Sequence, residues 1–228
     1  MIDKFTDYKT IVFDCDGVIL NSNKVKTQAF FDLAETWGTE AQNLLVHYHI
    51  NNGGISRHIK IAYFLRTILP SLSIKISSVE FDSIYTELVS LYAKLVYEGL
   101  CRCEVSPALD SLRDLTSTTR WSIVSGGDQK ELNKLFQDRG LSHLFDAGIF
   151  GSPDDKQLIL QREFSSGNFI NSSLFIGDSK YDHISATTMS MDFLFLSLWT
   201  EFHDWKNYTS KHRITSLPSL LTLVDSLK

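Results

Sequence analysis

Apolar residues gather in short runs along much of the chain, and each run closes on a small or acidic residue. Between the runs lie segments with apolar residues at helical spacing, such as residues 129–139 and 156–164. Short runs that are apolar on both faces are typical of parallel strands buried between two layers of helices. The pattern therefore predicts an α/β fold whose core is a doubly wound, Rossmann-like parallel sheet. The predicted strands are IVFD (11–14), WSIVSGG (121–127), FDAGIFGS (145–152), SLFIGDS (173–179) and DFLFLS (192–197).

The region from residue 22 to about residue 100 breaks this rhythm. Its apolar residues recur near helical spacing within 55–68 and 84–95, and Pro70 with neighbouring serines marks a loop between helices. No stretch of it resembles a strand. We therefore predict an all-helical cap domain inserted after the first strand. The expected boundaries are 1–20 and 104–228 for the catalytic core and 21–103 for the cap.

Composition narrows the class of protein further. The chain has 228 residues with a formal net charge of −5 and no cluster of lysine and arginine, which argues against a nucleic-acid partner. No apolar run approaches the roughly 20 residues of a membrane span, and the N-terminal residues are not typical of a signal peptide. We expect no membrane partner and a cytoplasmic location. The three cysteines, Cys15, Cys101 and Cys103, are expected to be free thiols.

Polar side chains follow several of the predicted strands. In an open parallel sheet, ligands bind at the carboxyl ends of the strands, near the switch in strand order. Carboxylates, a hydroxyl and an ammonium group gathered at this edge suit a phosphate together with a hard cation such as Mg²⁺. The residues in these positions are Asp14, Asp16, Ser125, Lys156, Asp178 and Asp182.

These residues fall into four ordered motifs, namely DCDGV (14–18), IVS (123–125), the lysine of GSPDDK (151–156) and GDSKYD (177–182). In this order and spacing the chain resembles the haloacid dehalogenase superfamily of phosphohydrolases over nearly its whole length. The helical insertion looks like the C1 cap of the subfamily that contains β-phosphoglucomutase and phosphoglycolate phosphatase. The order of the four motifs makes the resemblance specific, since DxDG alone is found in ordinary turns.

The resemblance implies a role for each acid. Asp14 would attack phosphorus and form an aspartyl-phosphate, for which its carboxyl should be ionised at neutral pH, given a reference pKa of about 3.9. Asp16 would protonate the leaving oxygen and then activate water, and its backbone carbonyl is expected to ligate Mg²⁺. Asp14 and Asp178 would hold the metal, and Asp182 would support a metal-bound water or orient the lysine.

The resemblance also implies phosphate ligands outside the acids. Ser125 and the Gly126 amide would bind phosphoryl oxygens, and Lys156 would neutralise charge on the phosphate and on Asp14. Each residue also has a plain structural interpretation. The turn after residue 125 could serve only to join a strand to a helix, and Lys156 could be a solvated helix lysine. In that interpretation Ser152 caps the helix that contains Lys156.

Two cap residues bear on the substrate. Arg57, in NNGGISRHIK (51–60), follows two glycines and begins a helix, where a cation is unfavourable unless it serves another purpose. This string resembles the cap loop of β-phosphoglucomutase, so Arg57 is expected to meet the leaving-group half of the substrate. Lys26 stands where the mutase carries a histidine, and is expected to face the catalytic pocket. We expect His49 to be an ordinary surface or cap-core residue and LWTEFHDW (198–205) to serve packing.

The leading hypothesis is a Mg²⁺-dependent phosphatase acting on a small phosphate ester, in particular a sugar phosphate, as a monomer or homodimer. A sugar phosphomutase using the same aspartyl-phosphate is the main alternative, although the absence of the histidine at position 26 weakens it. A non-catalytic phosphate-binding regulator is the alternative from another class. A dehalogenase is disfavoured because Asp16 and the metal-binding acids have no obvious purpose there.

Overall fold

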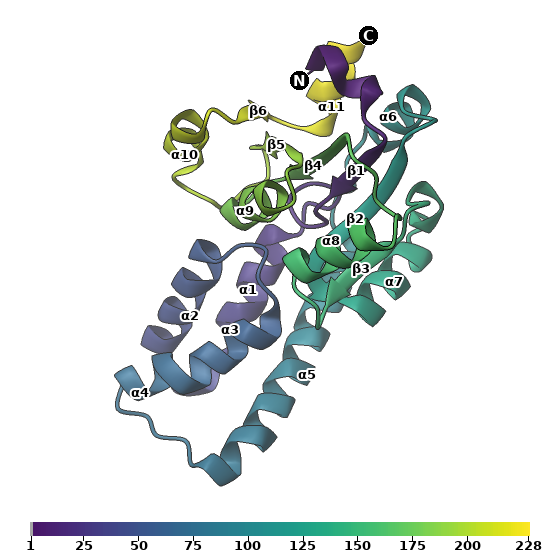
Figure 1. Ribbon diagram of the computed structural model, residues 1–228. Coiled ribbons are helices and arrows are strands. Elements are labelled where there is room, and N and C mark those ends of the chain that lie inside the picture. The colour runs from purple at the N-terminus through teal and green to yellow at the C-terminus, as the bar shows by residue number, and fades with distance from the viewer. Residues whose placement is uncertain (1) are drawn as a thin grey trace.

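The core of the protein is a six-stranded sheet in which every pair of neighbouring strands is parallel. The computed structural model describes residues 2–228 (Figure 1). The strand order is β3-β2-β1-β4-β5-β6. The predicted α/β fold is confirmed, and the five predicted runs all form strands; the short edge strand β6 was not predicted. The strands are β1 Thr10–Phe13, β2 Arg120–Asp128, β3 Ile149–Ser152, β4 Ser173–Gly177, β5 Asp192–Leu196 and β6 Thr215–Leu217.

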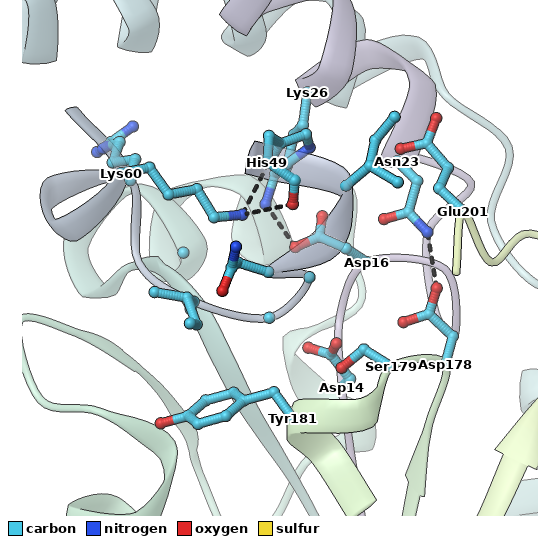
Figure 2. Close-up of a pocket in the computed structure, with 18 of the residues that line it drawn as sticks. Asp14, Asp16, Asn23, Lys26, His49, Lys60, Asp178, Ser179, Tyr181 and Glu201 are labelled. Atoms are coloured by element: carbon cyan, nitrogen blue, oxygen red, sulfur yellow. Dashed lines mark hydrogen bonds and ion pairs between the residues drawn. The ribbon is translucent and has the colours of Figure 1, made fainter. Parts of the chain in front are cut away.

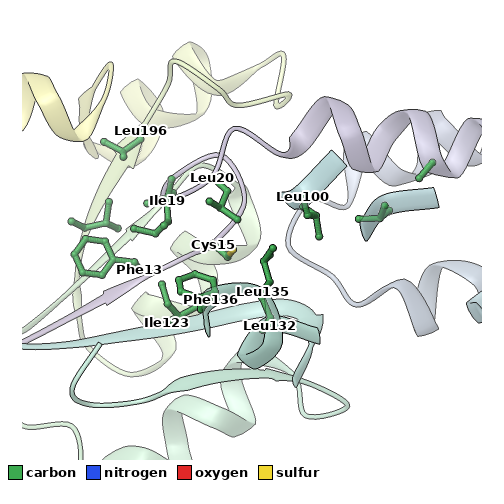
Figure 3. Packing of buried hydrophobic residues seen from close by; sticks show 14 of the residues in the cluster. Phe13, Cys15, Ile19, Leu20, Leu100, Ile123, Leu132, Leu135, Phe136 and Leu196 are labelled. Carbon is green, nitrogen blue, oxygen red and sulfur yellow. The ribbon is translucent and has the colours of Figure 1, made fainter. Parts of the chain in front are cut away.

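Both faces of the sheet are buried, as the apolar runs indicated. Alternate residues of a strand point to opposite faces, and accordingly Phe13 joins one apolar cluster while Val12 joins the other. The first cluster (Figure 3) includes residues of α6 (Leu109–Leu115), α7 (Gln129–Asp138) and α11 (Leu220–Leu227). The second includes residues of α8 (Lys156–Ser165), α9 (Lys180–Thr188) and α10 (Trp205–His212). Short helical turns complete the core, namely η1 (Ile2–Asp7) and η4 (Ser142–Leu144).

Within the described chain, the stretch between residues 23 and 102 is helical and contains no strand. These cap helices lie together below the sheet in Figure 1, where α1 packs against α2 and α5, and α3 packs against α5. Together they form a layer beyond the ends of the central strands. The helices are α1 (Asn23–Leu33), η2 (Glu35–Trp37), α2 (Thr39–Asn51), α3 (Arg57–Tyr63), the π-helical turn η3 (Phe64–Ile68), α4 (Leu69–Ser71) and α5 (Ser78–Arg102).

The two connections between cap and core run side by side. Leu20 forms an antiparallel bridge with Val105, and the Asn21 amide donates to the Glu104 carbonyl oxygen at 2.9 Å. This pairing supports the division at residues 20/21 and 103/104, which remains our prediction. The larger apolar cluster continues from the sheet into the cap through residues such as Leu100, so the two parts share one hydrophobic core in this conformation (Figure 3).

The switch in strand order lies between β1 and β4. The chain winds outwards from β1 through β2 and β3, then returns to the other side of β1 and continues through β4, β5 and β6. The loops that follow β1 and β4 therefore diverge and leave room for a ligand between them. Asp14 follows β1 and Asp178 follows β4, so the topology brings the first and fourth motifs together. No helix within residues 2–228 has the length and apolar character needed to cross a bilayer.

Candidate active site

Asp14 lies at the bottom of the site, directly after β1, and is almost fully buried. Its Oδ1 accepts hydrogen bonds from the Cys15 amide at 2.7 Å and pairs with Lys156 Nζ at 2.8 Å. No described residue bonds to its Oδ2, which is the oxygen free to meet a ligand. Gly17 closes this turn with φ +72°, and a Cβ there would overlap the carboxylate of Asp178, so only glycine fits.

Lys156 is buried at the first position of α8, and its ammonium lies between two carboxylates. It contacts Asp14 Oδ1 at 2.8 Å and Asp182 Oδ1 at 2.5 Å. The interpretation as a solvated helix lysine is therefore wrong. The expected cap was also wrong, because Asp155 caps α8 by accepting from the Leu158 amide, whereas Ser152 belongs to β3.

Asp178 and Asp182 complete an acidic cluster with Asp14, in which one oxygen of each residue lies within 4.8 Å of the others. Asp182 is held firmly, since its Oδ2 accepts from the Ser179 hydroxyl at 2.7 Å in a capping box at the start of α9. Asp178 accepts from Asn23 Nδ2 at 2.7 Å (Figure 2). With both Asp182 oxygens engaged, Asp14 and Asp178 offer the freer oxygens for a cation.

The electrostatics of this cluster are those of crowded negative charge. Burial and the neighbouring Asp182 raise the pKa of Asp14 to about 7, although Lys156 opposes the shift. Burial and Asp14 raise the pKa of Asp178 well above its usual value. Without a bound cation, the pKa of Asp14 therefore lies above the reference value from which we expected an ionised carboxylate. A divalent cation beside these oxygens would favour their ionised forms.

Asp16 points away from that cluster and towards the cap. Its Oδ1 accepts from the Ser22 hydroxyl and its Oδ2 from Lys26 Nζ, each at 2.5 Å. Burial alone would raise the pKa of Asp16, but the contacts with Lys26 and Ser22 outweigh burial and lower it. The structure thus places Lys26 in the pocket as expected. The ligand role of the Asp16 carbonyl remains a prediction.

The loop after Val124 approaches the cap. Ser125 is fully buried, and its Oγ accepts from the Gly127 amide at 3.0 Å. Ser125 is not among the described residues that line the cavity, whereas Gly126 is. A Cβ at Gly126 would overlap the carbonyl of Gly54, so this glycine allows core and cap loops to touch. Phosphate binding by Ser125 and Gly126 stays a prediction.

Arg57 also lines the cavity, but its guanidinium is already paired. It makes two hydrogen bonds to Glu131 of the core, at 2.8 and 2.7 Å, and approaches Asp128 at 3.8 Å. A bidentate pair of this kind joins α3 of the cap to α7 of the core. A substrate anion would have to compete with Glu131, and contact between Arg57 and the substrate remains a prediction.

The residues described above surround a cavity of about 310 Å³ between sheet and cap. Sequence reasoning missed a second group of lining residues, which come from α1, α2, α3 and the loop after β5. The expectation that LWTEFHDW serves packing did not foresee that residues 200–202 line the cavity. The missed residues include Asn23, His49, Lys60 and Glu201, which Figure 2 labels, and Thr200.

Comparison with known proteins identifies the family of the chain. The sequence profile of the haloacid dehalogenase-like hydrolases matches residues 8–186. No curated protein gave a significant match. Many solved structures share the fold. The three described below have a sequence identity so low that the likeness indicates the fold alone.

Three solved structures illustrate the likeness. A haloacid dehalogenase-like family protein from Streptococcus pneumoniae has a TM-score of 0.63 and 19% identity, with 97% of this chain and 99% of that chain covered. A predicted phosphatase from Clostridium acetobutylicum has a TM-score of 0.70 and 15% identity, with coverages of 96% and 98%. A predicted phosphoglycolate phosphatase from Haemophilus somnus 129pt has a TM-score of 0.66 and 18% identity, with coverages of 84% and 86%.

Proposed function

Because the chain belongs to the haloacid dehalogenase-like hydrolases, we propose that it is a Mg²⁺-dependent phosphatase that hydrolyses a small phosphate monoester through an aspartyl-phosphate. The observation that carries the proposal is the placement of Lys156 between Asp14 and Asp182, beside Asp178, at the switch point of the sheet. The phosphatase names of two of the structural relatives agree with this choice. We keep a sugar phosphate as the specific hypothesis for the substrate.

The acidic cluster fits a hard cation. Three buried carboxylates within 4.8 Å of one another share one lysine, so their negative charge exceeds the positive charge available from Lys156. Asp14 and Asp178 would hold Mg²⁺, together with the Asp16 carbonyl, and Asp182 would keep Lys156 in place. When bound, Mg²⁺ would reduce the repulsion between the carboxylate and the phosphate and would polarise the phosphoryl oxygens.

In the first step, Asp14 attacks phosphorus and the bond from phosphorus to the leaving oxygen breaks. Lys156, bonded to Asp14 Oδ1, keeps this carboxylate fixed and leaves Oδ2 available. The leaving oxygen needs a proton. Asp16 would supply that proton from its carboxyl group, whose Oδ2 accepts a hydrogen bond from Lys26.

In the second step, Asp16 accepts a proton from water as the water attacks the phosphorus of the aspartyl-phosphate. The bond between phosphorus and Asp14 then breaks, which releases inorganic phosphate and restores the carboxylate. The lowered pKa of Asp16 keeps its carboxylate ionised at this stage, so that it can accept the proton. The cap closes over these groups, so bulk water is kept from the first step.

The test is release of inorganic phosphate from a panel of phosphate monoesters, measured with Mg²⁺ and with an excess of chelator. We expect release with Mg²⁺ only. A mutase would retain the phosphate on the sugar, and a binding regulator would release none from any ester. Either result would reject the proposed hydrolysis.

A further inference from the structure

The cap wall of the cavity contains a second charged group that the proposed reaction does not use. Lys60 on α3 is 2% exposed, and His49 on α2 is 8% exposed. The Lys60 ammonium donates to His49 Nδ1 at 2.7 Å and lies 3.5 Å from the His49 carbonyl oxygen. Figure 2 shows the Lys60 amine directed from the cap towards the space above Asp16.

Lys60 differs from the other buried or partly buried cations around the cavity; Lys180, which also lines it, is exposed to solvent. Lys26, Arg57 and Lys156 each have a carboxylate oxygen within 2.8 Å. In the part of the chain that the structure describes, no carboxylate oxygen lies within 4.0 Å of Lys60 Nζ. A buried ammonium without a counter-ion is unfavourable, and an anion bound beside it would offset this cost.

The neighbours of Lys60 do not supply that anion. Burial and the charges of Lys60 and Lys26 hold the pKa of His49 well below its usual value, so the imidazole is a neutral acceptor. Burial and Lys26 also lower the pKa of Lys60 to about 7, as expected for an amine that lacks a counter-ion. Glu201, also in the cavity wall, instead accepts a hydrogen bond from Thr27.

We propose that Lys60 determines specificity by binding a second anionic group, a carboxylate or a phosphate, on the leaving-group side of the substrate. This inference rests on the proposed function, which assigns the transferred phosphoryl group to Asp14 at the sheet edge. His49 positions the amine by accepting from it at Nδ1 and, over a longer distance, at the carbonyl oxygen, which leaves one hydrogen for the ligand. A cavity of about 310 Å³ limits the substrate to a compact metabolite.

Three esters of a three-carbon chain distinguish the possible ligands. Glycerol 3-phosphate offers hydroxyl groups, 3-phosphoglycerate offers a carboxylate, and propane-1,3-diol bisphosphate offers a second phosphate. Binding to the Mg²⁺-loaded Asp14→Asn variant, measured by calorimetry, does not depend on turnover. At least one of the two esters with a second anion should bind about ten- to a hundredfold more tightly than glycerol 3-phosphate.

Lys60→Met in the same background should abolish this preference and leave the affinity for glycerol 3-phosphate nearly unchanged. Lys60→Arg should retain part of the preference. Lys94→Met, which removes an exposed lysine of α5, is the charge-matched control and should keep all of it. An undiminished preference in Lys60→Met, or an equal loss for all three esters, would overturn the inference.

Two further measurements keep the result clear. Lys60→Met removes a buried charge that lacks a counter-ion and should not lower the thermal stability. If it fails to fold, Lys60→Arg provides the test, and an undiminished preference in Lys60→Arg would overturn the inference. A wild-type protein that releases no phosphate would reject the phosphatase, while the binding preference would still test the subsite. A parent that binds the three esters equally would reject the subsite even if hydrolysis occurs.

Discussion

The sheet edge (Asp14, Lys156, Asp178 and Asp182, at the carboxyl ends of the strands) and the cap wall (His49 and Lys60) lie around one cavity. Each contains a buried lysine, but the two lysines have different partners. At the sheet edge, Lys156 is surrounded by Asp14 and Asp182, and these contacts raise its pKa above the usual value although burial alone would lower it. On the cap wall, Lys60 has a neutral imidazole as its partner, and its pKa is lowered to about 7. The first arrangement is complete within the protein apart from a cation, whereas the second lacks an anion.

This difference indicates that the sheet edge carries out the reaction, whereas the cap wall recognises the substrate. A fixed set of charges at the sheet edge suits a reaction that is the same for every phosphate ester, because preorganised groups need not rearrange during the step. An amine without a counter-ion on the cap suits a part of the ligand that varies between substrates. Changes at the sheet edge should therefore affect all substrates, and changes on the cap wall should affect only some.

The largest effect is expected at Asp14. Asp14→Asn should reduce kcat by about 10⁴-fold or more for every ester, because the neutral amide is a poor nucleophile and cannot form the acyl phosphate. The measurement is phosphate release, with circular dichroism to confirm the fold. A folded variant that keeps near-wild-type kcat would contradict the covalent mechanism.

The next effect concerns the metal. Asp178→Ala should raise the Mg²⁺ concentration needed for half-maximal activity by more than about a hundredfold, since Asp178 offers a free oxygen to the cation. Asp182→Ala should raise it by a smaller factor, about ten- to a hundredfold, because Asp182 acts through Lys156. Mg²⁺ activation curves give both values. Equal shifts in the two variants would show that Asp182 is itself a ligand.

The parallel sheet could be predicted from the sequence because its strands are apolar on both faces. The residues of the sheet edge could also be predicted from the sequence, because the four motifs each follow a strand. In the sheet, β1 and β4 are neighbours, which brings the first and fourth motifs together. Strand β6 was not predicted because it has only three residues, none of them fully buried, and it is the outermost strand of the sheet. A strand that is not buried on both faces lacks the continuous apolar signal.

The cap side of the site was harder to predict for a physical reason. Helical periodicity finds the helices but does not say which polar residue enters the cavity. Lys60 stands three positions after Arg57 on α3, and residues at this spacing lie on the same face of a helix. This spacing was the one feature of the sequence that could have indicated that Lys60 faces the cavity. The pairing of Arg57 with Glu131 depends on the distance between cap and core, which no local pattern encodes.

A third prediction separates two roles for Arg57. If Arg57 serves mainly to join cap and core, Arg57→Ala and Glu131→Gln should each lower kcat/KM by about tenfold, and the double variant should lose little more. If Arg57 binds the leaving-group half of the substrate, Glu131→Gln should leave Arg57 free and should not reduce kcat/KM. Steady-state kinetics of the three variants with a polar ester and a small aryl phosphate decide between these roles. Equal effects on both esters favour the cap–core contact, and loss confined to the polar ester favours substrate binding.

The smallest predicted effect is the uptake of a fraction of a proton when the ligand binds, and it tests the cap wall directly. In the protein without a ligand, Lys60 has a pKa of about 7, so above that pH more than half of the Lys60 side chains have lost their proton. An anion bound beside the amine raises this pKa, because the ion pair favours the charged form. Binding should therefore take up protons between the free and the bound pKa, and affinity should fall as the pH rises above about 7. Below about pH 6 the amine is charged in both states, and Lys60 should take up none.

Calorimetry in two buffers of different ionisation enthalpy measures this uptake at pH 8, where the phosphate group of the ligand is already fully ionised. Other charged groups face or surround the amine, and several keep one charge state across this range: His49 is neutral, Lys26 is charged, and Asp16 is ionised. Lys156 stays charged, and Glu201 contributes a nearby negative charge. Subtracting the uptake of Lys60→Met, measured in the same Asp14→Asn background, isolates Lys60 from these groups. An uptake that persists unchanged in Lys60→Met would place the titrating group at the sheet edge and remove the distinction between the two regions.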